Sequence, residues 1–157
     1  MEIVGSVQED LSIEKRISIT PDILSKFKSL GFSVNLQKNY AKHLEINDKE
    51  FQNNGAIFSD TKKDVLEKSD IILKVNNPSL EDANLVKKNS ILIGQFDNNI
   101  NKDTINKLND KNVKVFSLNL LPRITRAQSM DVLSSQANLA GYKAVIESFS
   151  KFERLYQ

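Results

Sequence analysis

Residues 70–75 read DIILKV, and this apolar run decides the fold that we predict for the chain. A strand that is buried on both faces of a parallel sheet has such a near-continuous apolar sequence. Pro78 ends the run, because proline cannot continue a sheet ladder. Similar but shorter signals predict further strands at residues 2–7, 32–36, 56–58, 90–95 and 113–118.

Helices are predicted between these strands from the residues that start and end them. Thr20 with Pro21 is a start signal, and Gly31 is an end signal. Asn47 and Glu50 have the spacing of a capping box at the start of a second helix. The buried stripe of the first helix is predicted to consist of Ile23, Phe27 and Leu30.

Strands and helices therefore alternate along the chain. The alternation predicts right-handed crossovers and an α/β fold, with a doubly wound, mainly parallel sheet and helices on both faces. The expected architecture is flavodoxin-like or Rossmann-like and ends in a long C-terminal helix. Gly5, inside the first strand, predicts a close backbone approach. Further helices are predicted at residues 60–67, 79–88 and 101–110.

Composition excludes several classes of function. The chain has 157 residues, 39% hydrophobic and 27% charged, which is typical of one globular domain. A net charge of +2 with mixed signs gives no basic stripe for nucleic acid. Without cysteine, and with His43 as the single histidine, no metal site or thiol chemistry is predicted. The apolar runs are too short to span a membrane, and the start does not resemble a signal peptide.

A polar segment follows the last predicted strand. Residues 122–131 read PRITRAQSMD and include Arg123, Arg126, Gln128 and Asp131. In open α/β sheets, ligands bind outside the carboxyl ends of the strands. From spacing alone, Arg123 and Asp131 would be a surface ion pair and Gln128 a helix cap. A ligand site at this position is the other interpretation.

Small residues follow with helical spacing. Ala137, Ala140, Gly141 and Ala144 recur at i, i+3, i+4 and i+7, and so share one face of a helix. Glycine inside a helix costs roughly 1 kcal/mol relative to alanine, which suggests that another backbone packs here. When the companion domain is missing, such a face invites dimerisation.

The five glycines are too far apart to bind a pyrophosphate. They stand at positions 5, 31, 55, 94 and 141, so neither a G-x-G-x-x-G turn nor a Walker loop is present. We therefore expect that this chain alone does not hold a dinucleotide tightly.

Residues 122–145, PRITRAQSMDVLSSQANLAGYKAV, resemble almost letter for letter the signature loop of the alpha subunit of proton-translocating NAD(P) transhydrogenase. They are similar, more distantly, to the N-terminal domain of alanine dehydrogenase. The segment EKRISITP, around Arg16, resembles a motif of both families. The resemblance covers the whole chain but only the front of the NAD(H)-binding component. It implies that residues 1–133 are the family's N-terminal domain and that residues 134–157 begin a helix leading to an absent NAD-binding Rossmann domain.

The resemblance implies hydride transfer between NAD(H) and NADP(H), with Arg123, Gln128 and Asp131 as the catalytic residues. Arg123 would donate to the nicotinamide carboxamide of NAD(H), and Gln128 would reach the ribose of NADP(H). Asp131 would accept from the carboxamide or orient Ser134. Tyr142 is expected to hydrogen-bond Asp131 and hold the loop. Ser134 and Tyr142 thus join the cofactor-binding set.

The resemblance also implies partners and a location. The partners are the NAD-binding Rossmann domain, an NADP-binding domain and a membrane subunit with the proton channel. The enzyme would be Re/Si-specific and bacterial, with this component in the cytoplasm at the inner face of the membrane. The fragment alone is expected to be inactive.

Two other functions compete with hydride transfer between nucleotides. In alanine dehydrogenase the residue at Arg16 binds the substrate carboxylate, but Asn76 and Asp97 stand here near positions where that family has lysine and histidine. Arg16 is either such a ligand or a surface residue, and Lys74 is either structural or substrate-facing. A receiver module would place a phosphorylated aspartate where Lys74 stands, and an amine cannot form an acyl phosphate. The loop at residues 37–41, QKNYA, and Asn119 also depart from the transhydrogenase pattern, which leaves the role of that loop open.

Overall fold

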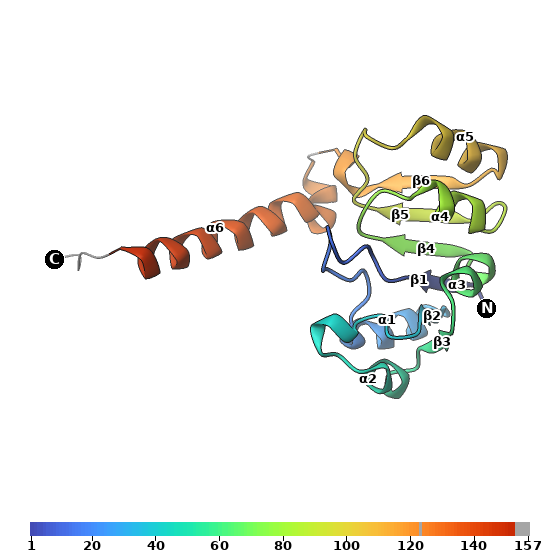
Figure 1. Cartoon of the computed structure of the whole chain (residues 1–157), viewed down its shortest axis with the longest axis horizontal. Coiled ribbons are helices and arrows are strands. Elements are labelled where there is room, and N and C mark those ends of the chain that lie inside the picture. The colour runs from blue at the N-terminus through green and yellow to red at the C-terminus, as the bar shows by residue number, and fades with distance from the viewer. Residues whose placement is uncertain (123, 153–157) are drawn as a thin grey trace. The chain divides into compact units, whose positions relative to one another are not determined.

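A computed structural model describes residues 1–122 and 124–152 of the chain (Figure 1). The chain divides into two compact units, Met1–Ser117 and Leu118–Gln157, and each is described by itself. The boundaries expected from the resemblance, 1–133 and 134–157, stay a prediction.

The first unit is built on one six-stranded sheet in which every neighbouring pair of strands is parallel. The strand order is β3-β2-β1-β4-β5-β6, which is that of the Rossmann fold. The direction of winding reverses between β1 and β4, so the switch point of the sheet lies between them. The strands are β1 (Ile3–Ser6), β2 (Ser33–Gln37), β3 (Ile57–Ser59), β4 (Ile71–Lys74), β5 (Ile91–Gly94) and β6 (Lys114–Ser117).

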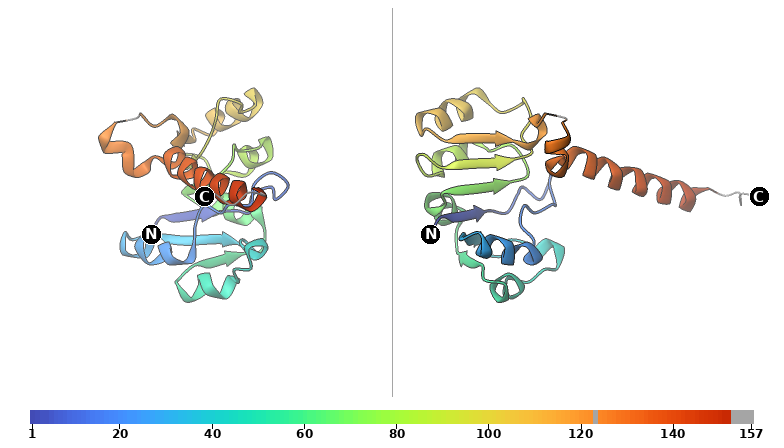
Figure 2. Two further views of the ribbon diagram at one scale, coloured as in Figure 1. Left: turned by 90° about the vertical axis from the view of Figure 1, so that its left-hand side faces the viewer. Right: turned by 180° about the vertical axis from the view of Figure 1, so that it is seen from behind.

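Helices cover both faces of this sheet, as predicted (Figures 1 and 2). On one face, α1 (Leu24–Ser29) and α2 (Asp48–Asn53) contribute Leu24 and Phe51 to a buried core. On the other face, the side chains of α3 (Lys62–Lys68), α4 (Leu80–Leu85) and α5 (Lys102–Asp110) form a second core with β4 and β5. Two short 3-10 turns, η1 (Pro21–Ile23) and η2 (Lys42–Leu44), complete the unit.

Local sequence signals are confirmed where both partners lie within one turn. The Asn47 backbone N–H donates to Glu50 Oε1 at 3.0 Å, which is one half of the predicted capping box of α2. Ser79 and Asp82 form a second box at the start of α4. A Cβ added at Gly5 would lie 2.8 Å from the Cβ of Ser69, so the predicted close approach is confirmed.

The prediction for the first helix is wrong in two details. Thr20 makes no side-chain cap, and the segment begins as the 3-10 turn η1 before it continues as α1. Leu30 is 72% exposed, because α1 ends at Ser29 and Leu30 is its C-cap. The change of helical pitch places Leu24 in the core instead, while Ile23 and Phe27 are half-buried against it. The helix predicted at residues 79–88 also ends early, at Leu85, since Val86 is extended.

The second unit consists of two 3-10 turns, η3 (Leu118–Leu120) and η4 (Thr125–Met130), followed by α6 (Val132–Lys151). The long C-terminal helix is therefore confirmed. None of the residues of α6 is buried. In residues 1–122 and 124–152, no helix combines the length and the apolar character of a membrane span.

Candidate functional site

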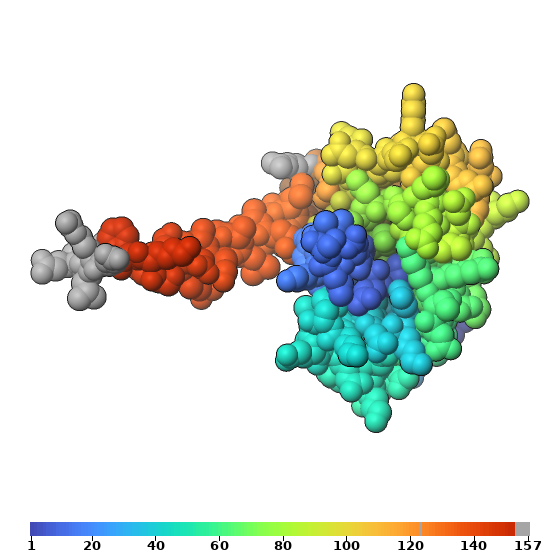
Figure 3. All heavy atoms as spheres, in the orientation of Figure 1, coloured from blue at the N-terminus to red at the C-terminus, as the bar shows by residue number. Residues whose placement is uncertain are grey.

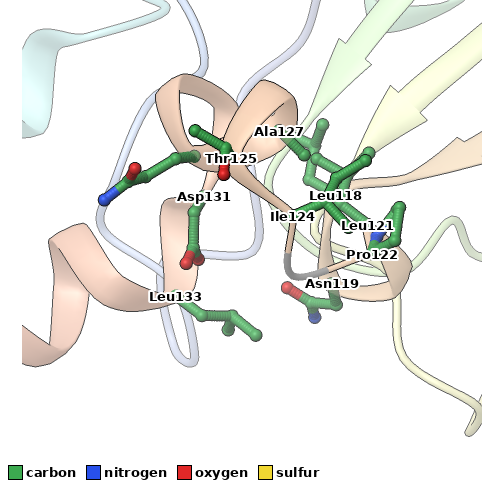
Figure 4. A pocket seen from close by; sticks show the side chains of 10 residues that line it. Leu118, Asn119, Leu121, Pro122, Ile124, Thr125, Ala127, Asp131 and Leu133 are labelled. Atoms are coloured by element: carbon green, nitrogen blue, oxygen red, sulfur yellow. The ribbon is translucent and has the colours of Figure 1, made fainter.

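The polar residues predicted as a site meet at a pocket in the second unit. The pocket has a volume of about 300 Å³. Its polar lining includes Asn119, Thr125, Gln128 and Asp131. Asp131 and Leu133 lie on one side, and apolar side chains lie on the other (Figure 4). The apolar lining residues are Leu118, Leu121, Pro122, Ile124, Ala127 and Leu133.

Asp131 stands at the junction of η4 and α6 and caps the helix. Its Oδ1 accepts from the backbone N–H of Ser134 at 3.0 Å, and its Oδ2 accepts from the Ser134 hydroxyl at 2.6 Å. The carboxylate is half-buried. An aspartate at this position is favoured by the free N–H groups and the positive end of the helix dipole. The orientation of Ser134 by Asp131, one of the two predicted roles of Asp131, is thus present in the structure.

The Ser134 hydroxyl is committed as a donor by this bond. Its single hydrogen points to Asp131, so toward any ligand its oxygen can only accept. A carboxylate has about four lone-pair sites, and the two bonds to Ser134 use two of those of Asp131. The start of α6 is therefore rich in acceptors, which suits a ligand group with N–H donors.

The remaining predicted residues are distributed around this pair. Gln128 lines the pocket and is exposed, and Arg126 is exposed in η4. Arg123 lies outside the described residues. Tyr142 lies in α6 and is 71% exposed. Eleven helical residues beyond Asp131 correspond to about 16 Å along the axis, so the expected hydrogen bond from Tyr142 to Asp131 is not formed. A role for Tyr142 in cofactor binding stays a prediction.

Thr125 is a pocket residue that sequence reasoning missed. The signal was available, since it lies between Arg123 and Arg126 in the polar segment. Asn119, which in the sequence is only a departure from the family pattern, lines the pocket too.

The first unit carries a buried ion network at the switch point of its sheet. Lys74, at the end of β4, lies 3.2 Å from Glu9 Oε2 and 3.2 Å from Asp82 Oδ2. The side chains of these three residues are 6%, 4% and 3% exposed, respectively. Lys62 of α3 reaches Asp82 Oδ1 at 2.6 Å and adds a second cation. Lys74 is therefore structural, one of the two roles predicted for it.

The acids and bases of this network balance one another. Burial of the Asp82 carboxyl acts to raise its pKa, but Lys74 and Lys62 outweigh this effect and hold the pKa below its usual value. For Lys62, burial lowers the pKa, and the hydrogen bond and charge of Asp82 reverse the sign and leave it raised. Both groups are therefore ionised at neutral pH.

Arg16 is held in a similar way by the chain itself. Its Nε and Nη2 donate to the two carboxylate oxygens of Glu14 at 2.9 and 2.7 Å, and Nη1 donates to Gln95 at 3.3 Å. The hydrogen bond from Arg16 lowers the pKa of Glu14, and the same bond raises the pKa of Arg16. Arg16 is thus neither a plain surface residue nor a cation without an anion.

Tyr40 gives the divergent loop at residues 37–41 a structural role that its sequence did not indicate. Its hydroxyl oxygen accepts from the backbone N–H groups of Ser18 and Ile19 at 2.9 and 3.1 Å. It also pairs with Ser6 Oγ at 2.9 Å. Burial raises the pKa of the phenol. Tyr40 therefore ties the loop before α1 to the end of β1.

Within the part of the chain that the structure describes, no three His, Cys, Asp or Glu side chains are grouped as metal ligands would be.

Comparison with known proteins assigns the fold and the loop to one family. The family model "Alanine dehydrogenase/PNT, N-terminal domain" matches residues 5–140. The chain belongs to this family. Its match includes the pocket residues of η4 and the start of α6.

Similar proteins include transhydrogenase subunits that are much longer than this chain. The first of the separately encoded pieces of the NAD(P) transhydrogenase alpha subunit of Rhodospirillum rubrum is 32% identical over 148 residues, which are 91% of this chain and 38% of that protein. The "NAD(P) transhydrogenase subunit alpha" of Haemophilus influenzae is 33% identical over 150 residues, or 96% of this chain and 29% of that protein. The chain thus spans well under half the length of these relatives.

Solved structures give the same assignment. The crystal structure of transhydrogenase from Sinorhizobium meliloti superimposes with a TM-score of 0.87 at 38% identity, over 98% of this chain and 46% of the other. An L-alanine dehydrogenase has a TM-score of 0.67 at 16% identity, over 74% of this chain and 32% of the other, and so shares the fold alone.

Proposed function

We propose that this chain is the front part of the NAD(H)-binding component of a proton-translocating NAD(P) transhydrogenase, Re/Si-specific, and that its pocket receives the nicotinamide end of NAD(H). The observation that carries the proposal is the pocket itself. It is lined by Gln128 and Asp131, two residues of the signature loop, in a chain that belongs to the family.

The pocket suits a nicotinamide ring in size and chemistry. Its volume of about 300 Å³ is at the lower end of the range for ligand pockets, roughly 300–1,000 Å³. It can hold a substituted ring but not a whole dinucleotide. Leu121 and Ile124 offer apolar surface to the ring faces. Asp131 and Ser134 offer acceptors to the N–H₂ group of the carboxamide, and Arg123 would donate to its carbonyl oxygen.

Positioning is all that these residues need to supply. The bound cofactors provide the chemistry, which is transfer of a hydride from one nicotinamide ring to another. No protein group has to take or give a proton in that step. The contribution of Asp131, Ser134 and Arg123 is to fix the ring orientation, and the contribution of Gln128 is to contact the ribose of NADP(H).

Other polypeptide would hold the remainder of both cofactors. We assign the rest of NAD(H) to a glycine-rich Rossmann domain, NADP(H) to a separate domain, and proton movement to a membrane subunit. The named relatives are alpha subunits and pieces of them, which supports a multi-component enzyme. The component would then lie in the cytoplasm at the inner face of the membrane, and the 157-residue fragment alone would be inactive.

The exposed apolar surface of α6 supports such an assembly. Large apolar side chains along the helix are exposed by about half or more, and no neighbouring atom lies within 4 Å of a Cβ built at Gly141. We propose that the Rossmann domain of the same subunit covers this surface, because the relatives extend far beyond the matched region. A homodimer through the small-residue face is the competing arrangement. The exposed residues are Leu139, Tyr142, Val145, Ile146, Phe149 and Phe152.

Amino-acid oxidation is disfavoured by the first unit. It needs a cationic clamp for the substrate carboxylate and a base. Lys74 is paired with Glu9 and Asp82, and Arg16 is paired with Glu14. Both candidate clamp residues are therefore neutralised within the chain.

A titration with NADH tests the proposal. The 157-residue chain and the same chain joined to a Rossmann domain from a transhydrogenase alpha subunit would be titrated by fluorescence. We expect no measurable binding by the short chain and micromolar binding by the joined one, with the affinity reduced by Asp131→Asn only in the latter. Micromolar binding by the short chain would overturn the division of labour. Absence of binding by a folded joined chain would overturn the assignment. Light scattering of both chains would separate a homodimer from a covered monomer.

A further inference from the structure

The carboxylate of Glu9 occupies the place where doubly wound sheets bind ligands. Glu9 follows β1, and its partner Lys74 ends β4, so the two residues flank the switch point of the sheet. Ligands of open α/β sheets bind in the crevice at this point. Figure 3 shows the blue segment after β1 lying on the surface beside the green segment that carries α3 and α4. The crevice is therefore covered by the chain's own loop.

The groups that surround this carboxylate are those that recognise a bound anion. Glu9 Oε1 accepts from the backbone N–H of Val75 at 2.6 Å, and Oε2 lies 3.2 Å from Lys74 Nζ. A backbone N–H and an ammonium give charge-assisted hydrogen bonds to a carboxylate of any origin. The Glu9 side chain is only 4% exposed, so water does not compete.

The charge balance of the crevice depends on Glu9. Two cations, Lys74 and Lys62, face two anions, Glu9 and Asp82. Removal of Glu9 leaves one positive charge in excess beside a buried lysine, which is costly without a replacement anion. Truncation to alanine removes Cγ, Cδ and both oxygens, which are together the heavy atoms of acetate.

We propose that Glu9 is an internal carboxylate ligand, which fills a small-carboxylate site at the switch point and whose removal opens that site to free acetate. The proposal does not depend on the proposed function, because it concerns the first unit alone. It assigns to Lys74 and the Val75 N–H the recognition of a monocarboxylate of two carbons.

Chemical rescue tests this assignment in the full 157-residue chain. Thermal unfolding would be followed by circular dichroism for Glu9→Ala, Glu9→Gln and the unaltered chain, in sodium acetate or sodium chloride at equal ionic strength. We expect the melting temperature of Glu9→Ala to fall by roughly 10 °C, and acetate to restore part of it in a saturable way. Propionate, which is one methylene too long, should restore less.

Glu9→Gln is the matched control. It keeps the volume of the side chain and an acceptor for the Val75 N–H, but it leaves no room for acetate, so it should be destabilised without rescue. Equal acetate effects in all three chains, or none in Glu9→Ala, would overturn the proposal. If Glu9→Ala is unfolded in chloride, folding in acetate supports the proposal, and an unfolded chain in both salts refutes it.

Discussion

The two units of the chain treat their polar groups in opposite ways. In the first unit, Lys74 and Arg16 are paired with carboxylates of the same unit, and the Lys74 network is buried. In the second unit, Gln128 and Ser134 are exposed at a pocket and α6 buries none of its residues. The difference teaches that ionic residues alone do not mark a functional site. The first unit meets its own requirements, whereas the second offers groups to something else.

The largest effect on the first unit is expected from Lys74→Met. The substitution leaves Glu9 and Asp82 as neighbouring buried carboxylates, and breaking a buried pair costs about 3–5 kcal/mol. Urea unfolding of the variant should show this loss. Lys62→Met is the control, because its side chain is 29% exposed and Asp82 would keep Lys74, so about 1 kcal/mol is expected. Equal losses in both variants would contradict the central place of Lys74.

A smaller effect is expected from Gly5→Ala. The added methyl group would overlap with the side chain of Ser69 and press on Val65, and overpacking of this kind costs about 1–3 kcal/mol. The same substitution in a Ser69→Gly background should cost much less. If the background makes no difference to the free energy of unfolding, the close approach is not the reason for glycine at this position.

The pH dependence of stability should report on Asp82. The folded state lowers the pKa of its carboxyl, so the stabilisation is complete above the unfolded-state pKa of about 3.9 and is lost as the pH falls through the lower folded-state value. The unaltered chain should therefore lose stability below about pH 4 more steeply than Asp82→Asn, since both retain Glu9, Lys62 and Lys74. Parallel acid limbs in the two unfolding curves would contradict this.

The smallest effect is expected from Gly141→Ala in the second unit. No atom lies within 4 Å of the added methyl group, and alanine favours a helix over glycine by up to about 1 kcal/mol. The 157-residue chain should become slightly more helical by circular dichroism. When a Rossmann domain is joined to the chain, the gain should vanish if that domain packs on Gly141. An equal gain in both forms would place the contact elsewhere.

The architecture was predictable because its signals are local or periodic. The capping residues Asn47 and Ser79 act within one turn, and the apolar run at residues 70–75 identifies a buried parallel strand without its neighbours. The error at Leu30 arose because a 3-10 start rotates the following helix, and sequence periodicity assumes one constant pitch.

The network of the first unit was not predictable for a different reason. Glu9 and Lys74 are 65 positions apart, and Tyr40 contacts Ser6 across 34 positions, so no spacing rule connects them. The pocket was predictable to some extent, because Gln128 and Asp131 belong to one short segment. The cap of Ser134 by Asp131 followed from the resemblance, whereas the distance that separates Tyr142 from Asp131 required the length of α6.

Hydride transfer by Asp131→Asn is the most direct test of the central claim, that the second unit orients a nicotinamide ring. Asparagine preserves the helix cap, so the fold should survive, but the anionic acceptor is lost. Transfer from NADH to NADP⁺ would be measured with the joined chain and an NADP-binding component. We predict a rate about 100-fold lower, as when one group that orients a reacting centre is removed. A rate within twofold of the unaltered protein would contradict the account.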